Sequence, residues 1–204
     1  MHSLSPVISL FAGFAFGSIP SGYLAGRLKG IDIRKHGSGN IGFTNVQRVL
    51  GLGWAVPVLV LDLAKGIIPV LLAERFGLLP AMVGLGAICG HIFCPWLGFN
   101  GGKGVATTIG VTAVLCPRAF LPAIAVFLLV LLVSGFVSLS SISFAISLPF
   151  LTLLFYRFDR TLLIFTLLTG MLIIIRHIPN IRRLTAGTEP KFGLWLKLFR
   201  RRTE

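Results

Sequence analysis

The sequence has 204 residues, of which 55% are hydrophobic and only 12% charged, with a mean hydropathy of +0.91. A soluble domain usually carries about a quarter of its residues as charges, so this chain has too few to cover a globule in water. Nineteen Lys and Arg against six Asp and Glu give a formal net charge of +13. Because so apolar a chain has no solvated face for a duplex, we exclude nucleic acid and retain an anionic membrane surface or an anionic substrate as the partner of this charge.

Apolar stretches of membrane-spanning length recur along the chain. A spanning helix needs about 20 largely apolar residues. We therefore predict an all-α, polytopic integral membrane protein with about seven transmembrane helices, forming a single membrane-embedded domain over residues 1–204. The predicted spans cover residues 4–25, 54–73, 79–97, 104–116, 119–135, 138–155 and 161–176. The fourth is short enough to be tilted or partly re-entrant.

The basic residues are distributed unevenly over the connections between these spans. One side of the membrane receives most of them, and the other side receives only Arg75, Arg118, Arg157 and Arg160. Because cytoplasmic loops carry an excess of Lys and Arg, we predict that the N-terminus lies outside and the C-terminus in the cytoplasm. The polar segments that then face the cytoplasm are the loops 26–53, 98–104 and 177–190, the turn 138–141 and a basic amphipathic tail, 191–204.

The loop 26–53 contains the first polar motif, a run of glycines and hydrogen-bonding side chains between Gly37 and Arg48. Glycines let backbone amides approach a ligand, and Ser, Asn and Thr side chains donate hydrogen bonds to phosphate oxygens. Arg48 adds a planar guanidinium that binds phosphate through two parallel hydrogen bonds. An ordinary Gly/Ser/Asn loop has the same composition, so the motif alone leaves both interpretations open.

Asp62 and Lys65 lie three residues apart inside the second predicted span. This spacing puts them on one helix face, where we expect them to pair. A pair that stabilises helix packing explains them at least as well as a catalytic pair does.

The second motif is Gly101-Gly102-Lys103-Gly104, at the start of an apolar helix. Free N–H groups at a helix N-terminus, the helix dipole and an ammonium group together form an anion site. The motif is not a Walker A loop, which needs Gly at Leu97 and Ser or Thr at Gly104, so nucleotide hydrolysis is not indicated. A glycine-rich turn whose lysine reaches the lipid headgroups explains these four residues equally well.

Cys89, His91 and Cys94 lie close together just before this motif. Their spacing fits no standard zinc pattern. We therefore predict no metal site, interpret the cysteines as small packing residues, and interpret His91 as a structural hydrogen-bonding residue rather than a catalyst.

The third motif begins at His177, where the last predicted span meets the cytoplasm. Histidine titrates near neutral pH and can accept a proton, and Asn180 can orient it or hold a substrate hydroxyl. A basic juxtamembrane segment explains Arg182 and Arg183 without any site, but it does not explain His177 and Asn180. Three serines, Ser138, Ser140 and Ser141, open the sixth predicted span, where they can cap the helix or touch substrate.

Together these segments resemble the PlsY family, the acyl-phosphate:glycerol-3-phosphate acyltransferases of bacterial phospholipid synthesis. The matching strings are SGN-G-TN--R at Ser38–Arg48, GH-F…GGKGVAT at Gly90–Thr107 and H--NI-RL--G-E at His177–Glu189. The resemblance implies transfer of a fatty acyl group from acyl phosphate to the 1-hydroxyl of glycerol 3-phosphate, giving lysophosphatidic acid and phosphate. It implies no cofactor, a place in the bacterial cytoplasmic (inner) membrane with the active site facing the cytoplasm, and the acyl-phosphate-producing enzyme as a candidate partner.

The resemblance also assigns roles to single residues. His177 and Asn180 are the predicted catalytic residues, with a phosphate oxygen of the substrate as a rival base to His177. Asp62, Lys65 and Glu189 are predicted to order the structure. The predicted substrate-binding residues are Ser38, Gly39, Asn40, Thr44, Asn45, Arg48, Gly101, Gly102, Lys103, Gly104, Ser141 and Arg183.

A second class of function fits part of the same pattern. A small transporter or channel for organic phosphates would also use a basic vestibule and an intramembrane pair. A transport pathway, however, needs polar groups at depth and at both mouths, whereas these motifs gather on one predicted face. A structural membrane subunit, as a third class, leaves the motifs around Ser38 and His177 without a purpose.

Overall fold

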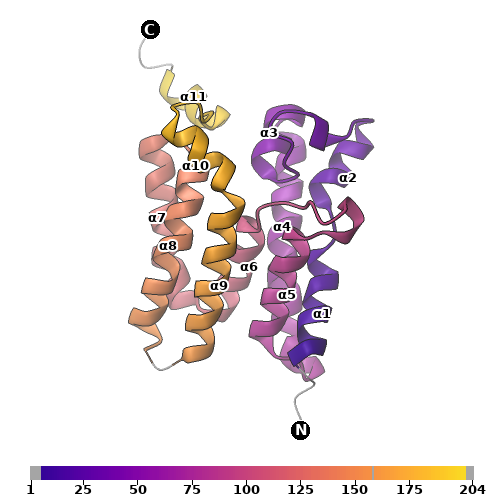
Figure 1. Cartoon of the computed structure of the whole chain (residues 1–204), viewed down its shortest axis with the longest axis vertical. Coiled ribbons are helices and arrows are strands. Elements are labelled where there is room, and N and C mark those ends of the chain that lie inside the picture. The colour runs from indigo at the N-terminus through magenta and orange to yellow at the C-terminus, as the bar shows by residue number, and fades with distance from the viewer. Residues whose placement is uncertain (1–5, 158, 201–204) are drawn as a thin grey trace. The chain divides into compact units, whose positions relative to one another are not determined.

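The computed structural model describes residues 6–157 and 159–200, and every regular element among them is helical (Figure 1). The all-α class is thus confirmed. Residues 4 and 5 of the first predicted span, and Arg201 and Arg202 of the predicted tail, lie outside the described residues. The chain divides into two compact units, one ending at Pro117 and one beginning at Arg118.

The first unit contains six α-helices and three short 3-10 helices. Its α-helices are α1 (Pro6–Gly17), α2 (Ser21–Leu28), α3 (Phe43–Leu50), α4 (Leu52–Ala73), α5 (Pro80–Ile92) and α6 (Val105–Leu115). Its 3-10 helices are η1 (Ile33–Lys35), η2 (Glu74–Phe76) and η3 (Pro95–Leu97). The second unit contains α7 (Pro117–Ser134), α8 (Val137–Phe155), α9 (Arg160–Arg176), α10 (Ile178–Thr185) and α11 (Gly193–Arg200).

Five of the described helices are long and apolar enough to cross a membrane, and a sixth candidate is the pair α9 and α10, bent by 56°. The five are Pro6–Leu28, Leu52–Phe76, Pro80–Leu97, Pro117–Ser134 and Val137–Phe155. The stretch 104–116, predicted as a separate span, forms α6 with only 11 residues, about half the length that a bilayer requires.

The first span is interrupted between α1 and α2, where Pro20 precedes α2. Non-helical backbone at membrane depth is tolerated only where the protein satisfies its polar groups. Here the carbonyl oxygen of Ser18 accepts a hydrogen bond from Cys94 Sγ at 3.1 Å, and that of Ile19 accepts one from Lys65 Nζ at 2.5 Å. The break therefore depends on side chains that come from later parts of the first unit.

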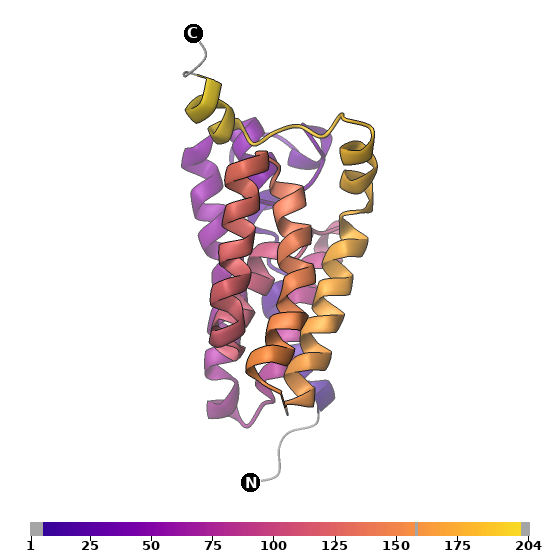
Figure 2. The ribbon, with the colours of Figure 1, turned by 90° about the vertical axis from the view of Figure 1, so that its left-hand side faces the viewer.

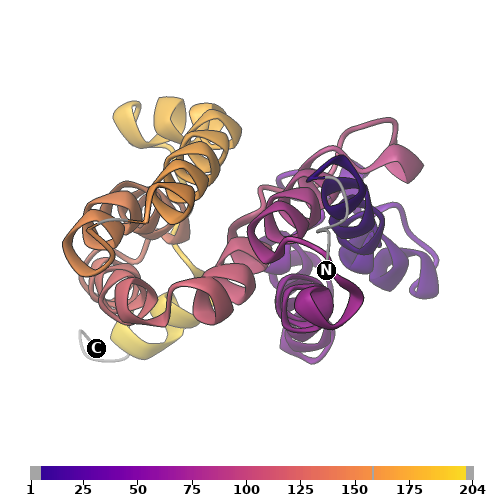
Figure 3. The same cartoon turned by 90° about the horizontal axis from the view of Figure 1, so that it is seen from below.

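Glycines bring α1 and α5 into direct backbone contact (Figures 1 and 3). Gly13 and Gly17 of α1 lie against the backbone of Val83 and Ala87 in α5, and Gly86 and Gly90 of α5 lie against the backbone of α1 at Leu10 and Phe14. The two glycines of each helix are four residues apart. A Cβ atom on Gly13 would lie 1.9 Å from the carbonyl oxygen of Val83. Small residues at this spacing are typical of tightly packed membrane helices, and α4 and α6 approach each other through glycines in the same way.

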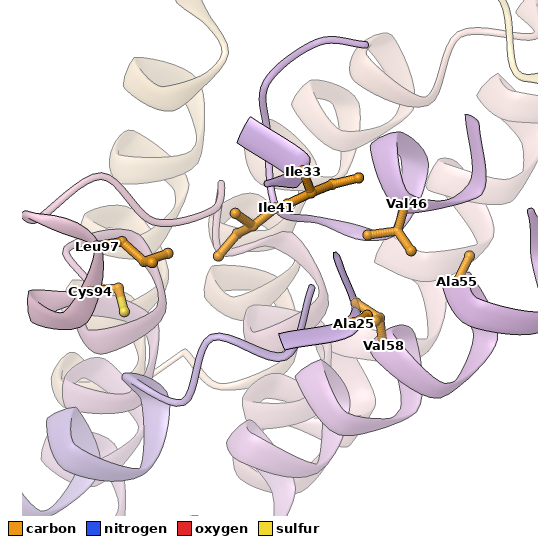
Figure 4. Close-up of a cluster of buried hydrophobic side chains, with 8 residues drawn as sticks. All are labelled: Ala25, Ile33, Ile41, Val46, Ala55, Val58, Cys94 and Leu97. Atoms are coloured by element: carbon orange, nitrogen blue, oxygen red, sulfur yellow. The ribbon is translucent and has the colours of Figure 1, made fainter. Parts of the chain in front are cut away.

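The polar loop 26–53 rests on a buried hydrophobic cluster (Figure 4). Ile33, Val46 and Ala55 are fully excluded from solvent. Burying one Val or Ile side chain contributes about 1.5–3 kcal/mol, so the cluster fixes η1 and α3 against α2 and α4. The members of the cluster are Ala25, Ile33, Ile41, Val46, Ala55, Val58, Cys94 and Leu97.

In the second unit α8 packs on α9, and the tail docks on the turn between α7 and α8 (Figure 2). The indole N–H of Trp195 donates to the carbonyl oxygen of Leu132 at 2.8 Å, and the backbone N–H of Phe192 donates to that of Gly135 at 2.8 Å. Gly135 has a φ of 76°, which favours glycine, and a Cβ atom there would lie 2.8 Å from the Trp195 ring. The turn is therefore shaped to receive the tail.

Basic residues gather at one end of the helices in each unit. In the first unit, Arg27, Arg34 and Arg48 lie around the end of α4 that begins beside α3, and Arg75 lies in η2 at the other end. In the second unit α10 and the tail follow the C-terminal end of α9, whereas Arg160 begins that helix.

Candidate functional site

The loop that carries the first motif is held in shape by Asn45. Its buried side-chain amide donates to the backbone carbonyls of His36 at 3.0 Å and Asn40 at 2.8 Å, and its Oδ1 accepts the backbone N–H of Ser38 at 2.8 Å. The amide thus bonds backbone through both of its ends. Asn45 organises the loop, and its predicted contact with substrate stays a prediction.

The remaining residues of this motif lie around the start of α3. Asn40 Oδ1 accepts the N–H of Gly42 at 2.8 Å, and Gly42 caps the helix. Thr44 is the second residue of α3 and is half-buried, while Arg48 lies one turn further along and is exposed. The loop therefore presents Ser38, Asn40 and Thr44 near one helix N-terminus.

An ion pair that the sequence reasoning did not anticipate lies at the edge of this loop. Arg34 Nη2 lies 2.7 Å from Asp32 Oδ2, and the guanidinium stands 5.0 Å from the centre of the Tyr23 ring. The hydrogen bond from Arg34 lowers the pKa of Asp32 to about 2.

The second motif forms a turn that sits directly on the end of α5. The N–H of Gly101 donates to the Ile92 carbonyl and that of Gly102 to the His91 carbonyl, both at 3.0 Å. A Cβ atom on Gly101 would lie 2.0 Å from the His91 carbonyl oxygen, so a larger residue does not fit there. Gly104, with a φ of 81°, then caps α6.

This arrangement leaves Lys103 between the turn and the first residues of α6, with its side chain half-buried. The N-terminus of a helix carries partial positive charge and unsatisfied N–H groups. The turn therefore combines a backbone anion site with a lysine ammonium group.

Beneath the turn lies a buried polar centre on α4. Lys65 Nζ lies 2.6 Å from Asp62 Oδ1, which confirms the predicted pair, and both side chains are almost fully excluded from solvent. The hydroxyl of Ser21, at the start of α2, donates to the same carboxylate oxygen. Nδ1 of His91 faces that oxygen from α5 at 3.7 Å.

In the second unit His177 occupies the bend between α9 and α10 and is buried. Its Nδ1 lies 2.8 Å from the carbonyl oxygen of Ile173. Because a carbonyl only accepts hydrogen bonds, Nδ1 carries the proton of the neutral ring and the lone pair lies on Nε2. This is the tautomer that a general base acting through Nε2 requires.

Glu189 folds back onto α10 and contacts two predicted site residues. Its carboxylate accepts hydrogen bonds from Asn180 Nδ2 and from Arg183 Nε, each at 2.7 Å. Burial by itself raises the pKa of Glu189, but the hydrogen bonds from Asn180 and Arg183, together with the charge of Arg183, outweigh burial and lower the pKa below its ordinary value. The charged carboxylate thus ties Asn180 and Arg183 to the segment that follows α10.

The serines of α8 do not cap that helix, contrary to one of the two sequence interpretations. The cap residue is Phe136, and α8 begins at Val137, so the serines lie inside the first turns. Ser141 Oγ donates to the Val137 carbonyl at 2.8 Å, as Ser140 Oγ does to that of Phe136 at 2.9 Å. The predicted substrate contact of Ser141 stays a prediction.

The structure thus places the predicted residues in two groups, one in each unit. Sequence reasoning missed Ser21 and the position of His91 between the buried pair and the glycine turn. Pro20 interrupts an otherwise apolar span, and this break could have indicated that Ser21 begins a new helix. The meeting of the two groups in one pocket stays a prediction.

The sequence matches the family model of glycerol-3-phosphate acyltransferases over residues 7–187. The glycerol-3-phosphate acyltransferase of Trichlorobacter lovleyi is 48% identical over 182 residues, covering 88% of this chain and 93% of that protein. The relative from Geobacter sulfurreducens is 42% identical, covering 93% of this chain and 98% of that protein. This chain belongs to the glycerol-3-phosphate acyltransferase family.

The fold of the acyltransferase is similar to two crystal structures of PlsY, each described as an integral membrane glycerol 3-phosphate acyltransferase. The glycerol 3-phosphate form has a TM-score of 0.87 and 40% identity, covering 96% of this chain and all of that chain. The lysophosphatidic acid form has a TM-score of 0.83 and 39% identity, covering 93% and 96%. The resemblance to the PlsY family inferred from the three motifs is thus confirmed, and the acyltransferase is an integral membrane enzyme.

Proposed function

We propose that this acyltransferase takes its acyl group from acyl phosphate and delivers it to the 1-hydroxyl of glycerol 3-phosphate. The products are then lysophosphatidic acid, for phospholipid synthesis, and inorganic phosphate. The observation that carries this proposal is the turn Gly101–Gly104, where the N–H groups at the start of α6 and the ammonium group of Lys103 together suit a phosphate dianion. A related protein solved in a lysophosphatidic acid form supports the product.

The reaction proceeds by direct attack. The 1-hydroxyl oxygen of glycerol 3-phosphate forms a bond to the acyl carbonyl carbon, the carbon–oxygen bond to phosphate breaks, and phosphate leaves with the electron pair. The donor is already activated, so no residue has to form an acyl-enzyme. The enzyme contributes by positioning two anionic substrates and by stabilising the negative charge that develops.

The attacking hydroxyl loses its proton to His177 Nε2, with a phosphate oxygen of the donor as the rival base. The hydrogen bond from Nδ1 to Ile173 supports His177, because it puts the ring lone pair on Nε2. A general base contributes about 10²–10⁴-fold, and we expect His177→Ala to lose at least 100-fold in turnover. A variant that stays within a few-fold of wild type would assign the proton to phosphate instead.

Substrate binding divides between the two groups of residues. The backbone of Gly39, Gly101, Gly102 and Gly104 lines the phosphate sites. The N–H groups of Gly39, Gly101 and Gly102 already donate to carbonyls of the protein, so the donors to phosphate oxygens are side chains and the first N–H groups of α6. Asn180 and Arg183, which Glu189 holds, contact glycerol 3-phosphate together with His177 and Ser141. The side chains assigned to phosphate groups are Ser38, Asn40, Thr44, Arg48 and Lys103.

We propose seven spans, counting α6 as a short one, with the N-terminus outside and all three motif loops on the cytoplasmic face of the bacterial cytoplasmic membrane. The clustering of basic residues at one end of the helices in each unit supports this orientation. Single cysteines at Ser38 and at Thr188, in a background free of the native cysteines, should react with a thiol reagent only when it reaches the cytoplasmic side. Labelling of either position from outside intact cells would overturn the orientation.

The reaction is tested with purified protein in detergent, given acyl phosphate and glycerol 3-phosphate. We expect stoichiometric release of inorganic phosphate and lysophosphatidic acid without a membrane gradient, whereas a transporter would require a sealed vesicle. The matched donor control is acyl-coenzyme A. Acyl transfer from the thioester, with none from acyl phosphate, would refute the proposed donor.

A further inference from the structure

His91 connects the buried polar centre to the glycine turn. It is the penultimate residue of α5 and is 4% exposed. Its Nδ1 lies 3.7 Å from Asp62 Oδ1, beyond hydrogen-bonding range but close enough for an electrostatic contact. On the opposite side of the ring, Nε2 lies only 2.0 Å from the position that a Cβ atom on Gly102 would occupy.

The same residue also holds the turn through its backbone, because the His91 carbonyl accepts the N–H of Gly102 at 3.0 Å. Two atoms of one residue therefore contact Gly102, the residue that immediately precedes Lys103. Any rotation of the His91 ring changes the space that Gly102 fills.

The other end of this connection is fixed. Asp62 Oδ1 is held by the hydroxyl of Ser21 and by Lys65 Nζ, and Lys65 also donates to the Ile19 carbonyl. These contacts join α2, the break before it and α4 in one buried, charge-balanced centre. A residue that bridges this centre to a flexible glycine turn transmits its rigidity to that turn.

We infer that His91 is a positioning residue for the phosphate site, holding the turn so that Lys103 and the first N–H groups of α6 converge on one anion. This inference rests on the proposed function of the turn. A misplacement of about 1 Å in a catalytic site can cost about 100-fold, so the contact has a measurable effect on substrate binding.

Three substitutions of His91, which differ in which imidazole nitrogen they replace with another nitrogen, test the inference. His91→Leu keeps much of the volume without nitrogen, His91→Asn keeps a nitrogen near the Nδ1 position, and His91→Gln keeps one near the Nε2 position. We expect His91→Leu to raise KM for at least one of the two phosphate substrates about tenfold or more, and one of the amide variants to recover most of that loss. If His91 only fills space in the protein interior, its replacement should lower the melting temperature and the active fraction of the enzyme while leaving KM unchanged.

A size exchange provides an independent test. The three atoms nearest to a Cβ atom on Gly102 all belong to the His91 ring, whereas the two nearest atoms to a Cβ on Gly101 are backbone carbonyl oxygens. The losses from Gly102→Ala and His91→Ala should therefore be strongly non-additive, because the smaller residue makes room for the methyl group. Gly101→Ala, the matched control, should add its full loss to that of His91→Ala.

The outcomes separate the inference from the proposed function. A wild-type enzyme that does not turn over acyl phosphate refutes the proposed function. A wild-type enzyme that turns over, combined with an unchanged KM in His91→Leu or with full additivity of Gly102→Ala and His91→Ala, refutes only the role of His91.

Discussion

Replacing Lys65 by methionine tests how the buried centre is stabilised. Methionine keeps most of the side-chain length but removes the ammonium group. The Asp62 carboxylate, 2% exposed, then keeps Ser21 as a hydrogen-bond donor but loses the cation at 2.6 Å. Breaking one side of a buried ion pair costs about 3–5 kcal/mol. For a chain of this size that corresponds to a melting temperature lower by about 6–20 °C.

Removing both charges should cost less than removing one. In the double variant Asp62→Asn/Lys65→Met no buried charge remains, and the amide can still accept from Ser21. The remaining loss is the hydrogen bond to the Ile19 carbonyl, a part-buried acceptor that then lacks its donor, at about 1–3 kcal/mol. We therefore expect the double variant to melt at a higher temperature than Lys65→Met alone.

The assay is tryptophan fluorescence during heating of the purified protein in one detergent. A fixed scan rate is needed because irreversible unfolding makes the midpoint depend on that rate. Asp32→Asn, at the solvent-accessible pair with Arg34, is the control and should lower the melting temperature much less than Lys65→Met does. If the double variant melts below wild type by the full sum of the losses of Asp62→Asn and Lys65→Met measured singly, Asp62 and Lys65 do not act as a pair and the reasoning fails.

Three further predictions concern the charge in the turn, the carboxylate on α10 and the glycine interface. Lys103→Met should lower kcat/KM about 10- to 150-fold in the phosphate-release assay, since a hydrogen bond to a charged group contributes about 1.5–3 kcal/mol. Lys103→Arg keeps a cation and should recover part of the lost activity. Equal activity of the two variants would contradict a phosphate contact. Because the pKa of Glu189 is lowered in the folded protein, its charged carboxylate stabilises the fold fully above the ordinary pKa of 4.5, and this stabilisation is lost as the pH falls through the pKa of the folded state. The melting temperature of wild type should therefore fall more than that of Glu189→Gln between pH 7 and pH 4. Equal falls for the two proteins would refute this. Gly86→Ala, whose Cβ would lie 2.0 Å from the Leu10 carbonyl oxygen, should lose about 1–3 kcal/mol of stability. The control, Gly53→Ala in α4, has open space around the new methyl group and should lose none. Equal melting temperatures of the two variants would contradict the close contact of α1 and α5.

The Asp62–Lys65 pair was predictable because its geometry is local. Residues three apart on a helix share a face whatever surrounds them, and an unpaired charge in an apolar span is costly. The contacts of this pair with Ser21 and Ile19 were not predictable in the same way, because they need the packing of α2 and its preceding break against α4.

The role of Asn45 shows a similar limit at the first motif. Composition placed it among hydrogen-bonding residues around Gly37, and such side chains bind phosphate or backbone equally well. Only the path of the loop decides, because it brings the carbonyls of His36 and Asn40 within reach of one amide. The sequence therefore located the motif but did not separate the residues that shape it from those that remain available to a ligand.

Helix boundaries failed where glycine or serine occurs at the edge of an apolar run. From hydropathy, we predicted that the fourth span starts at residue 104. In the structure Gly104 has a left-handed backbone conformation, and α6 begins at Val105. Ser138, the first of the three serines, lies two residues after Phe136, which caps α8, so none of them can cap the helix. Hydropathy measures the length of an apolar stretch, whereas the caps depend on backbone dihedral angles.

The scarcity of acidic residues connects the fold to the chemistry. The sequence has six of them, and four bind groups of the protein itself: Asp32 pairs with Arg34, Asp62 with Lys65 and Glu189 with Arg183, while Asp159 accepts the N–H of Leu162 at the start of α9. Carboxylates engaged in this way already accept hydrogen bonds from groups of the protein and are poorly placed to accept a proton from a substrate hydroxyl. The excess of nineteen basic over six acidic residues creates a positive potential that attracts phosphate-bearing substrates. A reaction between two phosphate-bearing substrates, with a histidine or a phosphate oxygen as the base, is the chemistry that such a distribution of charge supports.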